Sequence, residues 1–272
     1  MSKVLIIRFS AIGDVAMTIP IIYSAAKANP KDSFTVLTQT FLMPLFMNLP
    51  ENVTIMGVNI GSTEKSFWSL LRYASMLRKY KFDKVLDLHD VLRSWIIDMF
   101  FLVSGKKIFK IDKGRKERKQ IIARPPKEIY RLRPVTKRYA DVFRKAGFDF
   151  DETFVSLLEN KPVMESFPEE KKGKWIGIAP FAKHKGKMYP LDKMEIVVKQ
   201  LSEKENITVF LLGGRGREAE QLKEWSEKYP NVRNAAGCYF IDNELVLISK
   251  LDLLISMDSA NMHLASLVGT DV

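Results

Sequence analysis

The stretch Arg8-Phe9-Ser10-Ala11-Ile12-Gly13-Asp14-Val15-Ala16-Met17-Thr18-Ile19-Pro20 decides the fold of this chain. It follows a short apolar run that we interpret as a buried strand, and it opens a helical pattern. A second stretch near the other end, Ser256-Met257-Asp258-Ser259-Ala260-Asn261-Met262-His263-Leu264-Ala265, has the same form. It places hydroxyl, amide and imidazole groups at a predicted helix N-terminus, where backbone N–H groups can hold phosphate.

Strand-like and helical segments alternate along the rest of the chain, which predicts parallel sheets covered by helices. The predicted strands are rich in Val, Ile, Leu and Phe, and comprise 4–9, 34–37, 84–88, 175–179, 208–212 and 253–257. The clearest helical patterns are 68–80, 191–203 and 218–228. We therefore predict an α/β chain with two doubly wound, Rossmann-like domains facing a cleft.

A charged, proline-containing segment at 149–173 has little apolar content and is typical of a linker. It divides the chain into a predicted N-terminal domain, 1–160, and a predicted C-terminal domain, 174–272. The second domain has only about four predicted strands, which is few for a doubly wound sheet. We therefore expect this domain to be truncated at its C-terminal end.

The composition sets limits on where the protein acts. The chain has 272 residues, 46% of them hydrophobic and 28% charged, which suits globular domains with real cores. Cys238 is the only cysteine, so no intrachain disulfide can form and a reducing compartment is expected. No apolar run is long enough to span a bilayer. We expect a cytoplasmic protein that associates with a membrane peripherally at most.

The net charge of +11 comes from one segment, 106–138, which holds 14 Lys and Arg residues and three acids. The other 29 basic residues are balanced by 29 acidic residues. Such a segment suits a phosphate-rich partner, either anionic lipid, a phosphorylated glycolipid or nucleic acid. The alternative is a solvated loop with no partner. The neighbouring apolar stretch 95–103 predicts a helix buried on the sheet or, alternatively, a membrane-facing helix with basic flanks.

Five motifs follow one another along the chain: Ser10-x-x-Gly13-Asp14, Asp87-Leu88-His89-x-x-x-Arg93-Ser94, Lys187-x-Tyr189-Pro190, Gly213-Gly214-x-Gly216-x-Glu218 and Asp258-Ser259-x-x-x-His263. In this order they resemble the heptosyltransferase family (glycosyltransferase family 9), which builds the inner core of lipopolysaccharide from ADP-heptose. The resemblance implies a two-domain glycosyltransferase of GT-B type. It also implies an ADP-sugar donor, a phosphorylated glycolipid acceptor such as the lipopolysaccharide core, inverting transfer and no metal or other cofactor.

The first half of the chain supplies the expected acceptor side. An inverting transfer needs a carboxylate that takes the proton of the attacking hydroxyl, and Asp14 is the expected catalytic base. The alternative is that Asp14 is only a helix N-cap. Ser10, Gly13 and Arg93 are the other residues expected on this side, since Gly13 allows the turn to approach a ligand closely.

The second half supplies the expected donor side. Its expected residues are Lys187, Glu218, Asp258, Ser259, Ala260 and His263. Lys187 would stabilise the negative charge of the departing diphosphate, and Glu218 would accept hydrogen bonds from ribose. The family usually has glycine at position 260, so Ala260 is a departure with a cost if that backbone needs positive φ. The alternative roles are plain helix capping by Asp258 and Ser259, and a core position for His263.

Other functions fit the sequence less well. The Gly213–Gly216 loop lacks the full glycine fingerprint of dinucleotide-binding enzymes. The three histidines are too dispersed for a zinc site, and we expect no metal site. The alternative to an enzyme is a non-catalytic nucleotide-fold protein that docks anionic lipid or nucleic acid through 106–138. The chain lacks aromatic-basic RNA-binding signatures, so nucleic acid is not the expected partner.

Overall fold

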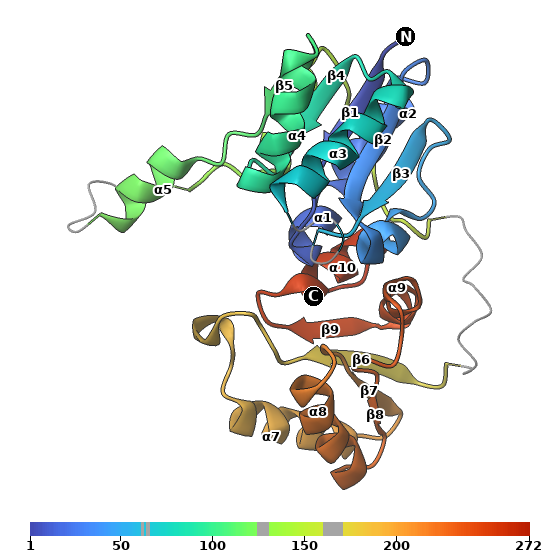
Figure 1. Ribbon diagram of the computed structural model, residues 1–272. Helices are drawn as coiled ribbons and strands as arrows, with labels where there is room; N and C mark the ends of the chain where they lie inside the picture. The colour runs from blue at the N-terminus through green and yellow to red at the C-terminus, as the bar shows by residue number, and fades with distance from the viewer. Residues whose placement is uncertain (61–62, 64–65, 124–130, 160–170) are drawn as a thin grey trace. The chain divides into compact units, whose positions relative to one another are not determined.

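A computed structural model describes residues 1–60, 63, 66–123, 131–159 and 171–272, and it contains two parallel β-sheets (Figure 1). The chain forms two compact units, the first from Met1–Ser10 and Met17–Phe154, the second from Ala11–Ala16 and Val155–Val272. The predicted fold class, two doubly wound α/β domains, is confirmed. The boundaries at 160 and 174 stay predictions, because residues 160–170 lie outside the described ranges.

The first unit is built on a five-stranded sheet in the order β3-β2-β1-β4-β5. The strands are β1 (Lys3–Ile7), β2 (Ser33–Gln39), β3 (Val53–Val58), β4 (Lys84–Asp87) and β5 (Lys107–Lys110). Its helices are α2 (Ile19–Ala28), α3 (Phe67–Leu77), α4 (Leu92–Val103), α5 (Arg115–Ile122) and α6 (Val135–Lys145). Short 3-10 helices lie at Thr40–Phe46 and Arg78–Tyr80.

Alternate side chains of the central strands build the two faces of this sheet. Leu5 and Ile7 pack in one cluster with the inner sides of α3 and α4. On the other face, Phe34 of β2 packs against Phe143 of α6. Because both faces are covered, the central strands are almost continuously apolar, which is why the sequence predicted them well.

The second unit is built on a four-stranded sheet in the order β8-β7-β6-β9. The strands are β6 (Lys174–Ala179), β7 (Ile207–Leu211), β8 (Val232–Asn234) and β9 (Leu253–Ser256). The helices are α1 (Ile12–Ala16), α7 (Leu191–Ser202), α8 (Arg217–Lys228), α9 (Ile241–Lys250) and α10 (Ala260–Val268), with a 3-10 turn at Lys185–Lys187. Its core joins Ile178 and Val209 to Val198 of α7 and Trp225 of α8.

None of the helices in the described ranges is both long enough and apolar enough to cross a bilayer.

Candidate active site

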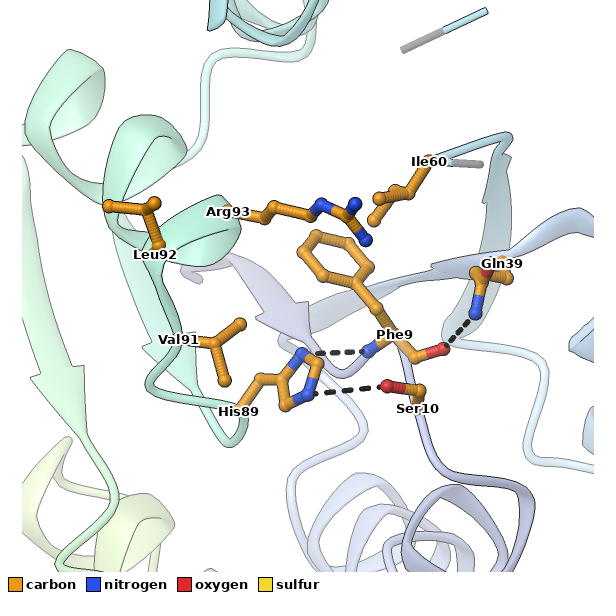
Figure 2. A pocket seen from close by; sticks show the side chains of 8 residues that line it. All are labelled: Phe9, Ser10, Gln39, Ile60, His89, Val91, Leu92 and Arg93. Atoms are coloured by element: carbon orange, nitrogen blue, oxygen red, sulfur yellow. Dashed lines mark hydrogen bonds between the residues drawn. The ribbon is translucent and has the colours of Figure 1, made fainter. Parts of the chain in front are cut away.

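A pocket of about 350 Å³ lies in the first unit, beyond the carboxyl ends of β1 and β4 (Figure 2). Two predicted site residues, Ser10 and Arg93, line it together. The other lining residues are Phe9, Gln39, Ile60, His89, Val91 and Leu92. The pocket thus has apolar walls and a few polar groups, which is the usual make-up of a ligand site.

Asp87 explains the geometry of the Asp87–Ser94 motif. One carboxylate oxygen accepts hydrogen bonds from the backbone N–H groups of His89 and Asp90, each at 2.8 Å. The other oxygen accepts from the Ser94 hydroxyl at 2.7 Å, and that hydroxyl oxygen also accepts from the Val91 N–H at the start of α4. Asp87 and Ser94 therefore hold the turn that presents His89 and Arg93 to the pocket.

His89 belongs to the Asp87–Ser94 motif, but no role in the site could be assigned to it from the sequence. Its Nδ1 accepts a hydrogen bond from the Phe9 N–H at 3.4 Å, and its Nε2 lies 3.5 Å from the Ser10 hydroxyl (Figure 2). Burial, followed by the positive charges of Arg8, Lys113 and Arg93, lowers the pKa of His89 to about 3. The ring is therefore neutral at physiological pH. With Nδ1 as acceptor its proton is on Nε2, where it can be donated to Ser10.

The second unit gathers most of the remaining predicted residues at the carboxyl edge of its sheet. Lys187 Nζ lies 2.5 Å from Asp258 Oδ2, and both side chains are largely exposed. This contact with Lys187 lowers the pKa of Asp258. The two residues follow β6 and β9, which are neighbours in the sheet, so their loops emerge side by side.

Helix α10 begins beside this ion pair, with Ser259 as its N-cap residue. Ser259 makes no side-chain capping hydrogen bond to the helix, and its hydroxyl lies 3.4 Å from that of Ser256. Plain capping by Ser259 is therefore not its role in this structure. Ala260 is the first helical residue and is not among the residues with positive φ, so its departure from glycine carries no backbone strain.

Helix α1 packs against α10 within the second unit. A Cβ atom on Gly13 would lie 2.5 Å from the ring of His263, so only glycine fits at position 13. Burial lowers the pKa of His263, and the negative charges of Asp14 and Asp258 oppose this effect. Asp14, His263, Asp258 and Lys187 thus form one charged cluster in this unit.

The position of Asp14 differs from a plain N-cap. It is the third residue of α1, and its Oδ2 accepts a hydrogen bond from the Ala11 N–H at 3.3 Å. Asp14 is at N3 and reaches back to the N-cap backbone N–H, which is one half of a capping box; Ala11 has no side-chain oxygen to supply the other half. The carboxylate is half-buried.

Glu218 lies in the first turn of α8, close to the glycine loop that precedes it. Its Oε2 accepts a hydrogen bond from the Gly214 N–H at 2.7 Å. Gly216 has a φ of 73°, in the region that favours glycine, and it lets the loop turn into the helix. One carboxylate oxygen of Glu218 is therefore engaged by the protein backbone.

Comparison with known proteins decides the family. The family model for glycosyltransferase family 9 (heptosyltransferase) matches residues 70–272. The chain belongs to glycosyltransferase family 9. The resemblance expected from the sequence motifs is confirmed, and the protein is a glycosyltransferase. The non-catalytic alternative is not favoured.

Individual members of family 9 are similar over nearly the whole chain. The lipopolysaccharide core heptosyltransferase OpsX of Haemophilus influenzae is 24% identical, over 98% of this chain and 76% of that protein. Escherichia coli heptosyltransferase WaaC, solved with ADP-2-deoxy-2-fluoro heptose, superimposes with a TM-score of 0.75 at 17% identity, over 98% of this chain and 86% of that one. E. coli ADP-heptose lps heptosyltransferase II superimposes with a TM-score of 0.70 at 19% identity, over 98% of this chain and 82% of that one. The solved structures establish the GT-B fold.

The basic segment of this family 9 chain is divided among several elements. Arg138 is buried, and its guanidinium group donates hydrogen bonds to the Glu117 carboxylate and the Asp112 carbonyl. Lys113 donates a hydrogen bond of 2.8 Å to the Asp90 carbonyl. Lys116, Arg118 and Lys119 of α5 are exposed. Some of these charges therefore hold the fold and others face solvent, while residues 124–130 lie outside the described ranges.

A buried carboxyl group behind the motif turn predicts a pH-dependent stability. Burial raises the pKa of Asp98 to about 7, the Asp87 carboxylate adds to this, and Lys110 Nζ, 2.8 Å away, opposes it. A raised folded-state pKa stabilises the fold at low pH. As the pH rises from about 4 to about 7, the free energy of unfolding falls by about 3 kcal/mol through the loss of this contribution.

The Asp98→Asn variant has no ionisable group at this position, so its free energy of unfolding should lack this decline with pH. Urea unfolding of parent and variant at several pH values in this range measures the difference between the two curves. Groups that do not interact with Asp98 cancel in this difference, whereas its neighbours Asp87 and Lys110 contribute to it. Parallel curves would contradict the raised pKa.

Proposed function

We propose that the chain transfers a heptose-like sugar, with inversion, from an ADP-sugar to a lipopolysaccharide core or related phosphorylated glycolipid. The observation that carries the proposal is the cluster of Asp14, His263, Asp258 and Lys187 beside the start of α10. Transfer from a nucleoside diphosphate sugar needs a carboxylate to accept a proton and cationic or N–H groups to bind the diphosphate, and the cluster provides both. The donors and acceptors in the names of the family 9 relatives support the same substrates.

The proposed reaction uses each group in one role. Asp14 takes the proton of the acceptor hydroxyl as its oxygen bonds to the anomeric carbon. The bond between that carbon and the diphosphate oxygen breaks, and ADP leaves with the electron pair. Lys187 and the N–H groups at the start of α10 stabilise the added negative charge, with Ser259 and His263 contacting phosphate or sugar. Glu218 accepts from the ribose hydroxyls.

The pocket in the first unit is the proposed acceptor site. Arg93, with Arg8 and Lys113 behind it, makes the pocket positive without help from the neutral His89. Such a pocket attracts a negatively charged sugar or a phosphate group. The His89 Nε2–H directs the Ser10 hydroxyl proton toward the bound ligand. The exposed cations of 106–138 would hold the acceptor's anionic membrane, at the cytoplasmic face.

Thermal unfolding with added nucleotides tests the donor class. ADP or an ADP-sugar at about 100 times its Kd should stabilise the protein by about 2.7 kcal/mol, and NAD or an oligonucleotide should not. Stabilisation by NAD alone would contradict the proposal and favour an oxidoreductase.

We expect transfer to need no divalent metal. Lys187 and the α10 N-terminus supply the positive potential for the leaving group, and no group of three or more potential metal ligands occurs among the residues described. Initial rates with and without EDTA should agree. Loss of transfer with EDTA, restored by magnesium or manganese, would overturn this part of the proposal.

A further inference from the structure

Helix α4 carries an exposed apolar surface that the catalytic proposal does not use. Its members, here called the α4 stripe, are exposed by 71%, 38%, 64%, 61% and 86%: Leu92, Trp95, Met99, Leu102 and Val103, respectively. Their spacing of three, four, three and one residues places them on one side of the helix. The opposite side, with Ile97 and Phe101, is buried against the sheet. The prediction of a helix buried on the sheet holds for this side, and the alternative of a membrane-facing helix stays a prediction for the exposed side.

The stripe runs from the rim of the proposed acceptor pocket to a basic end. Leu92 belongs both to the stripe and to the pocket wall (Figure 2). The twelve residues of α4 extend about 18 Å from there. Just past the helix come Lys106 and Lys107, and the latter is exposed. An apolar path therefore joins the pocket to a pair of cations.

Positive charge predominates on this surface, since the Asp90 carboxylate at its pocket end, which accepts a hydrogen bond from Trp95 Nε1 at 2.7 Å, is paired with Arg115. Lys110 Nζ lies 5.7 Å from the centre of the Trp95 ring. Between residues 91 and 110, a range described throughout, the one acidic residue is Asp98, which is buried. The exposed cations of α5 follow shortly after. An apolar stripe with cationic flanks, whose nearby acids Asp90 and Asp98 are each paired with a cation, is complementary to an anionic lipid interface.

We propose that the α4 stripe docks on an anionic phospholipid bilayer, with Met99, Leu102 and Val103 among the acyl chains and Lys106 and Lys107 at the headgroups. This deepens the acceptor side of the proposed function, on which it rests for the identity of the pocket. Docking in this way holds the pocket rim at the level where a lipid-anchored acceptor presents its sugars. A second copy of the chain is a poorer occupant, because two chains that each carry a net charge of +11 repel each other.

Vesicle binding of matched variants tests the proposal. Met99→Glu/Val103→Glu places two acids in the stripe. Val155→Glu/Ile196→Glu is the control, because it makes the same change in charge at apolar residues of the second unit that are 64% and 55% exposed. On phosphatidylglycerol vesicles we expect the stripe variant to lose about tenfold or more in partitioning, and the control to bind like the parent. Phosphatidylcholine vesicles should bind all three weakly.

Tryptophan fluorescence locates the contact. Trp175 and Trp225 are each 2% exposed, whereas Trp68 and Trp95 are exposed, so Trp68→Phe leaves Trp95 as the tryptophan that reports on the surface. Phosphatidylglycerol with brominated acyl chains should shift its emission to the blue and quench it.

Three results would overturn the proposal: parent-like vesicle binding by the stripe variant, no binding by the parent, or unquenched Trp95 in bound protein. A stripe variant that binds vesicles normally but loses self-association in sedimentation would assign the stripe to a dimer. Circular dichroism and unfolding temperatures confirm that each variant is folded. Stabilisation by ADP tests the proposed function separately, because it does not depend on lipid.

Discussion

Replacement of Asp14 by Asn is expected to lower kcat by about 10²–10⁴, the usual loss for a missing general base. Asn keeps an oxygen that can accept from the Ala11 N–H, so the start of α1 stays capped while the basic group is gone. ADP affinity should not fall, because Asn removes a negative charge that can only repel the diphosphate. Steady-state kinetics with titration of ADP separates the two effects.

The control for Asp14 is Asp192→Asn, which changes an acid in the first turn of α7. It should leave kcat at the parent level. Near-normal turnover by Asp14→Asn would reduce Asp14 to its helix-capping role, and the catalytic base would have to be another residue.

Replacement of Lys187 by Gln is expected to lower kcat by about 10²–10³, the range for a lost group that stabilises developing negative charge. Its ammonium group lies at the start of α10, where the helix dipole also favours a phosphate. Affinity for the donor should fall as well, since the same charge attracts the bound diphosphate. Kinetics at several donor concentrations measures both quantities.

The matched control is Lys185→Gln, in the same 3-10 turn, whose side chain is exposed. It should retain most activity, and Lys187→Arg should be less impaired than Lys187→Gln because it keeps the charge. If Lys187→Gln behaved like the parent, its role would be limited to the ion pair with Asp258.

The central strands and the edge strand β9 could be predicted from the sequence, whereas the edge strands β3, β5 and β8 could not. β1 and β6 are buried on both faces and consist almost entirely of apolar residues. β5 is a short edge strand with an exposed lysine at each end, and β8 has three residues, of which Arg233 is exposed. Neither contains the apolar run on which such predictions depend, and β3, with mixed exposure, was missed for the same reason.

The positions of the motifs could be predicted from the sequence, whereas the residues that the motif side chains contact could not. The expectation that Ser259 precedes a helix is confirmed, because a strand ending in polar residues before a helical pattern is a local signal. The contact of His89 with Phe9 and Ser10 depends on β1 and β4 being neighbours in register, with Ile7 opposite Asp87. The packing of Gly13 against His263 likewise joins residues from opposite ends of the chain. Only the three-dimensional arrangement of the elements brings such pairs together.

The most direct test of the account is a transfer reaction with ADP-heptose and lipopolysaccharide that lacks core heptose. Mass spectrometry of the acceptor and assay of released ADP follow the two products. We expect an acceptor heavier by one heptose, one ADP released for each transfer, and loss of both with Asp14→Asn. An unchanged acceptor with ADP-heptose, combined with transfer from a uridine diphosphate sugar, would contradict it.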